Sequence, residues 1–114
     1  MKQKLLITGG TSMLGRALLD QVDRDKYDVM YPSHESVDLL SLEQTRQLFI
    51  NTLPDKVIHL ATYSGNIQFN QMYPVETFFR TTQIGLNVLK CCADFATKKV
   101  LSVLSSCAIA DLGD

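Results

Sequence analysis

The residues best suited to chemistry form a glycine-rich stretch, Thr8-Gly9-Gly10-Thr11-Ser12-Met13-Leu14-Gly15. A short apolar run precedes the stretch and a segment of helical periodicity follows it. Because such a turn exposes backbone amides and directs a helix N-terminus at an anion, it predicts a site for a dinucleotide pyrophosphate. Gly9 allows the tight turn and Gly15 allows close packing of helix on sheet, whereas Ser12 stands where a middle glycine is usual. An ordinary glycine-rich turn without a ligand is the alternative.

Residues around the second apolar run are candidates for contacts with the adenine and the ribose of such a dinucleotide. Asp38, followed by Leu39, could accept a hydrogen bond from an adenine amino group; a solvated aspartate before a helix is the alternative. The run ends in Tyr31-Pro32-Ser33-His34, with no acidic residue to hold a ribose diol and no arginine to hold a 2′-phosphate. The missing acid favours NADP(H), with Ser33 and His34 as candidate phosphate donors, and NAD(H) stays open.

Catalytic side chains are expected in Leu104-Ser105-Ser106-Cys107, after the fourth apolar run. In the expected strand order this run lies beside the first, and ligands of doubly wound sheets bind in the crevice between two such strands. The Ser105 hydroxyl would lie near the nicotinamide and could hydrogen-bond a substrate carbonyl. The Cys107 thiol could take or give a proton at carbon. The alternative is that the serines cap a strand end beside a core cysteine.

The elements that must position these residues alternate along the chain. Apolar runs predict strands over 4–8, 28–31, 56–61 and 100–104, and helical periodicity predicts helices over 13–22, 42–53 and 74–96. The second helix begins with the capping box Ser41-Leu42-Glu43-Gln44 and ends at Pro54, and Pro74 opens the third. The alternation is typical of an α/β fold with helices on both faces of a parallel sheet. We expect the strand order 3-2-1-4, half of a Rossmann-like doubly wound sheet.

The third expected helix carries one continuous apolar stripe, formed by Val75, Phe79, Thr82, Leu86, Leu89, Ala93 and Ala96. Burial against the sheet explains such a stripe, and so does packing against a second copy of the chain. Because the fourth strand would also leave an open sheet edge, we expect a homo-oligomer. Gly85 interrupts this helix at a cost of about 1 kcal/mol against alanine, so we expect a close neighbour there.

Composition narrows the class of protein. The 114 residues are 46% hydrophobic and 20% charged, as expected for one globular domain over residues 1–114. The 11 basic and 12 acidic residues give a net charge of -1, which argues against a nucleic-acid partner, and no apolar run is long enough for a membrane. The 3 cysteines and 2 histidines show no metal-site spacing. With no leader segment at the start, we expect a cytoplasmic protein.

Four segments together resemble the extended short-chain dehydrogenase/reductases, the NAD-dependent epimerase/dehydratase family: residues 8–15, Asp38-Leu39, Val57-Ile58-His59-Leu60-Ala61 and Leu104-Ser105-Ser106-Cys107. The most specific is the Ser-Ser-Cys, which is similar to that of the GDP-L-fucose synthase branch. The resemblance covers the N-terminal part of a usual member. It implies that Ser105 and Cys107 are catalytic and that Leu60 and Ala61 line the cofactor site. It also implies that NADPH reduces a GDP-linked keto sugar after epimerisation.

One motif of this family is missing, because no tyrosine in residues 1–114 has a lysine four residues on. We therefore expect the chain to be inactive alone, and to act on a GDP-sugar only when the C-terminal part of the fold completes it. Two other hypotheses stay open: a dinucleotide-binding module without turnover, and a degenerate remnant that keeps only the fold. Ser105 and Cys107 favour the enzyme, because a binding module needs neither.

Overall fold

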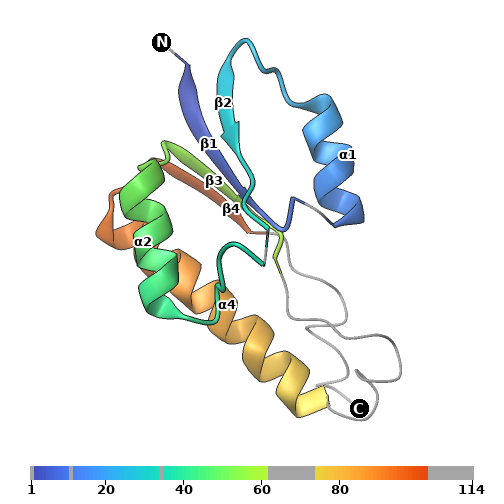
Figure 1. Cartoon of the computed structure of the whole chain (residues 1–114), viewed down its shortest axis with the longest axis vertical. Coiled ribbons are helices and arrows are strands. Elements are labelled where there is room, and N and C mark those ends of the chain that lie inside the picture. The colour runs from blue at the N-terminus through green and yellow to red at the C-terminus, as the bar shows by residue number, and fades with distance from the viewer. Residues whose placement is uncertain (1, 11, 34, 62–73, 103–114) are drawn as a thin grey trace.

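The computed structural model describes residues 2–10, 12–33, 35–61 and 74–102, with helices on both faces of a parallel sheet (Figure 1). The strands are β1 (Gln3–Thr8), β2 (Tyr27–Met30), β3 (Lys56–His59) and β4 (Lys99–Ser102). The helices are α1 (Met13–Gln21), α2 (Leu42–Thr52) and α4 (Pro74–Asp94). Each overlaps a segment predicted from the sequence, so the expected α/β fold is confirmed.

Side-chain chemistry explains where α2 begins and ends. The Ser41 hydroxyl accepts a hydrogen bond from the Gln44 amide at 3.2 Å, which is one half of the expected capping box. The Gln44 side chain does not return to Ser41, because its Oε1 accepts instead from the Asp38 amide at 3.0 Å. At the other end Leu53 is left-handed, with a φ of 44°, directly before Pro54. The capping box is therefore only half formed, while the helix ends where expected.

The strand order is β2-β1-β3-β4, so the predicted order 3-2-1-4 is wrong. Alternating strands and helices with right-handed crossovers allow two common doubly wound orders, and the sequence pattern does not distinguish them. The two orders differ at β3, which here pairs in parallel with β1 and β4 and not with β2. The connection through α2 therefore returns across β1 and places β3 on the side away from β2. This order puts the change of direction between β1 and β3.

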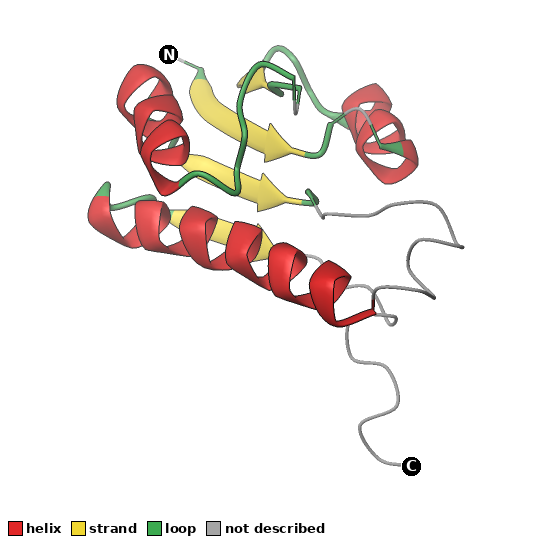
Figure 2. Ribbon diagram, turned by 60° about the horizontal axis from the view of Figure 1, so that its bottom comes forward, coloured by secondary structure: helices red, strands yellow, loops and turns green. Residues whose placement is uncertain are grey.

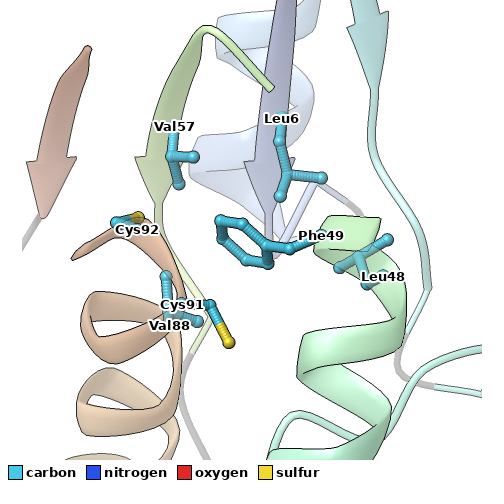
Figure 3. Close-up of a cluster of buried hydrophobic side chains, with 7 residues drawn as sticks. All are labelled: Leu6, Leu48, Phe49, Val57, Val88, Cys91 and Cys92. Carbon is cyan, nitrogen blue, oxygen red and sulfur yellow. The ribbon is translucent and has the colours of Figure 1, made fainter. Parts of the chain in front are cut away.

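The two faces of the sheet are covered by different helices, α1 on one and α2 with α4 on the other (Figure 2). Between the sheet and α2 and α4 lies a cluster of buried side chains (Figure 3): Leu6, Leu48, Phe49, Val57, Val88, Cys91 and Cys92. Burial raises the pKa of the Cys92 thiol to about 11, so this cysteine is a small core residue. In the described residues we find no metal-ligating cluster and no helix suited to crossing a membrane.

Helix α4 turns toward the sheet a face other than its apolar stripe. Its buried residues are Ile84, Asn87, Val88, Cys91 and Cys92. On the stripe, by contrast, Val75 is 80% exposed, Phe79 62% and Leu86 56%. Burial against the sheet is therefore the wrong explanation of the stripe. The helix has one apolar face in the core and a second that the described residues leave open.

The expectation of a close neighbour at Gly85 is wrong: the position has room for a side chain, because the nearest atom to a Cβ built there is His59 Nε2, at an ordinary 3.8 Å. We predict that Gly85→Ala raises the free energy of unfolding by about 0.5–1 kcal/mol, since alanine loses less backbone entropy in a helix. Urea unfolding followed by circular dichroism measures the change. The matched control, Gly15→Ala, should destabilise, because its Cβ would lie 2.6 Å from Gly10 Cα. A loss of stability in Gly85→Ala would contradict this packing.

Candidate functional site

The carboxyl ends of β1 and β3 are neighbours at the point where the sheet changes direction. From β1 the chain continues to α1 on one face, while α4, which follows β3, lies on the other face (Figure 2). Ligands of doubly wound sheets bind in the crevice at such a switch point. The glycine-rich turn follows β1 directly, and Leu60 and Ala61 follow β3 directly. The predicted cofactor residues of these two segments therefore meet at one edge of the sheet.

Gly9 is required by both conformation and space. Its φ of +75° is a left-handed value that side chains rarely adopt. A Cβ on Gly9 would also lie 2.8 Å from the Ala61 amide nitrogen and 2.8 Å from the Leu60 carbonyl carbon. The tight turn expected at this position is therefore present, and the backbone after β3 forms one wall of it.

Two further glycines bring other elements against the turn. A Cβ on Gly15 would overlap the Gly9 carbonyl oxygen, so α1 packs directly on the turn as predicted. A Cβ on Gly10 would lie 2.7 Å from Tyr31 Cβ. Because Tyr31 follows β2, the end of this strand also lies against the turn.

Ser12 caps α1 with its side chain folded back into the turn. The hydroxyl donates to the Gly9 carbonyl oxygen at 2.7 Å and accepts from the Gly15 amide at 3.1 Å. A helix cap thus stands where the usual motif has its middle glycine. The side chains of the next two residues are open to solvent, with Met13 88% and Leu14 54% exposed. Their amides lie in the first turn of α1, where a helix supplies no acceptor, and are available to an anion.

Asp38 and Leu39 have local roles in the approach to α2. Asp38 Oδ1 accepts from the Leu40 amide at 3.0 Å, and Leu39 packs against the core cluster. The buried Asn87 of α4 donates through Nδ2 to the carbonyl oxygens of Leu39 and Leu40, at 2.8 and 3.1 Å. These bonds anchor the segment and account for Asp38 without a ligand. The adenine contact of Asp38 stays a prediction.

A cation lies near the end of β2, which the sequence pattern does not predict. The Arg24 guanidinium carbon is 6.0 Å from the centre of the Tyr31 ring, within reach of a cation–π interaction. Ser33, a candidate phosphate donor, accepts a hydrogen bond from the Ser36 amide at 3.3 Å and so forms part of a turn. Because Tyr31 also lies against Gly10, the Arg24 side chain is held beside the residue that adjoins the glycine-rich turn.

Two polar side chains, Thr8 and His59, are buried at the switch point. The Thr8 hydroxyl oxygen lies 2.6 Å from His59 Nδ1. It also accepts from the amides of Leu60 and Ala61, at 3.1 and 3.2 Å. Burial lowers the pKa of His59 to about 4, so the ring is neutral at pH 7. Because an unfolded histidine titrates near 6.5, the buried neutral ring costs stability as the pH falls from 6.5 toward 4.

Thr8, His59 and Tyr31 had no predicted role of their own, although Thr8 and His59 lie in two of the segments that carry the family resemblance. A histidine within an apolar strand was the available signal for His59. The contact of Tyr31 with Gly10 depends on how β1 and β2 pair, and no local pattern reports this contact. This part of the site therefore depends on the pairing of the strands and not on a local sequence motif.

Four predicted site residues lie outside the described residues: Thr11, His34, Ser105 and Cys107. Ser105 was predicted to lie near the nicotinamide on the premise that the first and fourth strands are neighbours. That premise is wrong, because β3 lies between β1 and β4. The catalytic roles of Ser105 and Cys107 stay predictions.

The fold and the site together define a class of protein. A doubly wound parallel sheet carries, at its switch point, a glycine-rich turn that leads into a helix N-terminus, which is the arrangement of dinucleotide-binding α/β domains. The chain belongs to the NAD dependent epimerase/dehydratase family, which it matches over residues 5–114. This match confirms the resemblance drawn from the four sequence segments.

The relatives of the chain include nucleotide-sugar enzymes. It is 34% identical over 113 residues to the GDP-L-fucose synthase of Dictyostelium discoideum, covering 96% of this chain and 35% of that protein. It is 31% identical over 104 residues to the GDP-L-colitose synthase of Yersinia pseudotuberculosis, covering 91% and 34%. Among solved structures, the GDP-L-fucose synthetase of Naegleria fowleri bound to NADP is 32% identical with a TM-score of 0.78, covering 92% and 31%. The chain thus spans about a third of the length of these relatives.

The cap at Ser12 leads to a stability prediction. Ser12→Ala should lower the free energy of unfolding by about 1 kcal/mol, because the Gly15 amide loses its acceptor. Ser12→Gly should cost only a few tenths of a kcal/mol, since glycine is tolerated at a helix N-cap. Thermal unfolding of both variants measures the difference. Equal losses in the two would show that the hydroxyl is not acting as a cap.

Proposed function

We propose that residues 1–114 form a single Rossmann-like domain that binds NADP(H), as the N-terminal part of a nucleotide-sugar epimerase/reductase. The supporting observation is the turn at the switch point, where Gly9 and Gly15 leave no space for side chains and α1 begins with the amides of Met13 and Leu14, for which the helix supplies no acceptor. A dinucleotide pyrophosphate fits these donors. Membership of the family and the NADP-bound relative from Naegleria fowleri agree with this assignment.

The cofactor contacts that we propose are made at the same edge of the sheet. The residues that we propose are Gly9, Gly10, Thr11, Ser12, Met13, Leu14, Gly15, His34, Asp38, Leu39, Leu60 and Ala61. Two observations favour NADP(H) over NAD(H): no acidic residue ends β2, and Arg24 lies beside Tyr31. A guanidinium is well suited to a 2′-phosphate, whereas a ribose diol needs a carboxylate.

The reaction that we propose is epimerisation of a GDP-4-keto-6-deoxy sugar followed by its reduction. Hydride from the nicotinamide would reach the keto carbon while a proton reaches the oxygen. Ser105 would hydrogen-bond the carbonyl and Cys107 would move protons at carbon during epimerisation. The Tyr-x-x-x-Lys pair is not present in residues 1–114, so we propose that turnover needs the remaining part of the family fold. The cytoplasmic location, and the absence of nucleic-acid or membrane partners, stay predictions.

A second candidate is a dinucleotide-binding module without turnover. The observation that favours it is the position of the turn contacts, which come from residues 8–15, 31 and 60–61 and require nothing beyond residue 61. Such a module would bind the nucleotide and have no use for Ser105 or Cys107. Cofactor affinity alone does not distinguish the two candidates; reduction of a keto sugar by the chain joined to its C-terminal part does.

We further infer that the chain forms a homo-oligomer through the outer face of α4. The exposed residues of the stripe, with Thr82 as a polar member between Phe79 and Leu86, follow alternating steps of four and three, the spacing of a seam between two helices. Phe78 adds to this face, with 57% of its surface exposed. An apolar seam of this regularity is costly to leave in water, so a second copy of the same helix is a suitable partner.

The cofactor proposal is tested at one backbone amide. Met13 is the first residue of α1, where proline is tolerated, so Met13→Pro removes a single N–H while the helix is kept. We expect calorimetric titration to show NADPH binding in about the micromolar range, tighter than NADH. Met13→Pro should weaken it about 10- to 100-fold, the value of one hydrogen bond to a charged group. Met13→Ala keeps the amide and should bind as the unaltered chain does; no binding of either nucleotide to the folded chain would refute the proposal.

The oligomer is tested by sedimentation equilibrium. We expect the unaltered chain to associate, and Leu86→Lys to give a monomer, because a charge on the seam would be buried without a partner. Ile50→Lys is the matched control, since Ile50 is 49% exposed on α2 and lies outside the seam. A clean monomer for the unaltered chain would contradict the inferred association.

A further inference from the structure

The Thr8 hydroxyl has three hydrogen-bond neighbours among the described residues: the amides of Leu60 and Ala61, and Nδ1 of His59. A hydroxyl has one proton and two acceptor lone pairs. The amides of Leu60 and Ala61 can only donate, so together they occupy both lone pairs, the Leu60 amide sharing its proton with the Thr8 carbonyl oxygen at 3.0 Å. The hydroxyl proton is then left for His59 Nδ1, at 2.6 Å.

This count determines the tautomer of His59. If Nδ1 carried the proton, it would donate to the Thr8 hydroxyl, and among the described residues the hydroxyl proton would then have no acceptor. Nδ1 is therefore the acceptor, and the neutral ring carries its proton on Nε2. The Nε2 edge faces Gly85 of α4, where a Cβ position is 3.8 Å away, and the residue is only 5% exposed. The ring is thus enclosed between β3 and α4 with its acceptor directed at Thr8.

The hydroxyl lies where its hydrogen bonds control the shape of the turn. It bonds the two amides whose backbone forms the wall beside Gly9, and a Cβ on Gly9 would lie only 2.8 Å from that wall. A backbone shift of a few tenths of an ångström would change the space next to the turn. The hydrogen bonds that the Thr8 hydroxyl accepts from these amides therefore set the separation between the turn and the end of β3.

We propose that His59 is a positioning residue for the cofactor turn: by accepting a hydrogen bond from the Thr8 hydroxyl, it directs both lone pairs of that hydroxyl at the amides after β3. The ring does not touch the cofactor. It acts through Thr8 on the backbone of Leu60 and Ala61, and through that backbone on Gly9. The proposal rests on the proposed function only for the ligand that the turn holds, since the hydrogen-bond arrangement is a property of the free chain.

The test compares replacements of His59 that keep or remove the acceptor. The oxygen of Asn lies close to the place of Nδ1, so His59→Asn should retain NADPH affinity within about threefold. His59→Leu has no acceptor and should weaken NADPH binding about tenfold, because it leaves the buried Thr8 proton unpaired. Thr8→Ser and Thr8→Val form the same kind of pair at the hydroxyl. A structural role alone would lower stability in all four without this split in affinity.

Two further measurements test the hydrogen-bond arrangement itself in the folded, cofactor-free chain. Imidazole nitrogen chemical shifts of the cofactor-free chain should show Nδ1 unprotonated, and hydrogen exchange at the Leu60 and Ala61 amides should quicken in Thr8→Val but not in Thr8→Ser. A protonated Nδ1, or equal NADPH affinity in folded His59→Leu and His59→Asn, would overturn the proposal. If the unaltered chain binds no NADPH, the proposed function fails, and unchanged exchange in Thr8→Val then overturns this inference as well.

Discussion

The separation between the turn after β1 and the end of β3 is the constraint on which the site depends. Gly9 fits only because it has no side chain, and the backbone at Leu60 and Ala61 stands where its Cβ would be. Gly15 brings α1 onto the same turn, so the helix N-terminus points at the crevice. Each of these contacts is between backbone atoms. The site therefore depends on glycines, which let the backbone segments approach closely, rather than on charged side chains.

Local structure was predictable because it depends on neighbours in sequence. The apolar run ending at Gly9 and the serine cap at Ser41 identify where β1 ends and where α2 begins. The half-formed capping box shows the limit of this reasoning, since the Gln44 side chain bonds the Asp38 amide instead. A motif specifies which bonds a residue can make, and the packing of the surrounding chain selects among them.

Strand order and helix orientation were not predictable, because they depend on contacts between distant segments. The apolar run at 56–61 predicts a buried strand but does not show whether that strand pairs with β1 or with β2. The apolar stripe of α4 likewise indicates an interface, yet the helix buries Ile84 and Val88 against the sheet and exposes Phe79 and Leu86. The error in strand order also displaced the expected catalytic edge, since β3 rather than β4 adjoins β1.

The central claim, that the edge formed by β1, β3 and α1 holds a dinucleotide, is tested most directly by mapping backbone amide chemical shifts during titration with NADPH. The account predicts that the largest changes occur at Gly9, Met13, Leu14, Leu60 and Ala61. The opposite end of the sheet provides the contrast, where Tyr27, Lys56 and Lys99 line a cleft at the strand starts. Changes concentrated around that cleft, with the turn unaffected, would contradict the account.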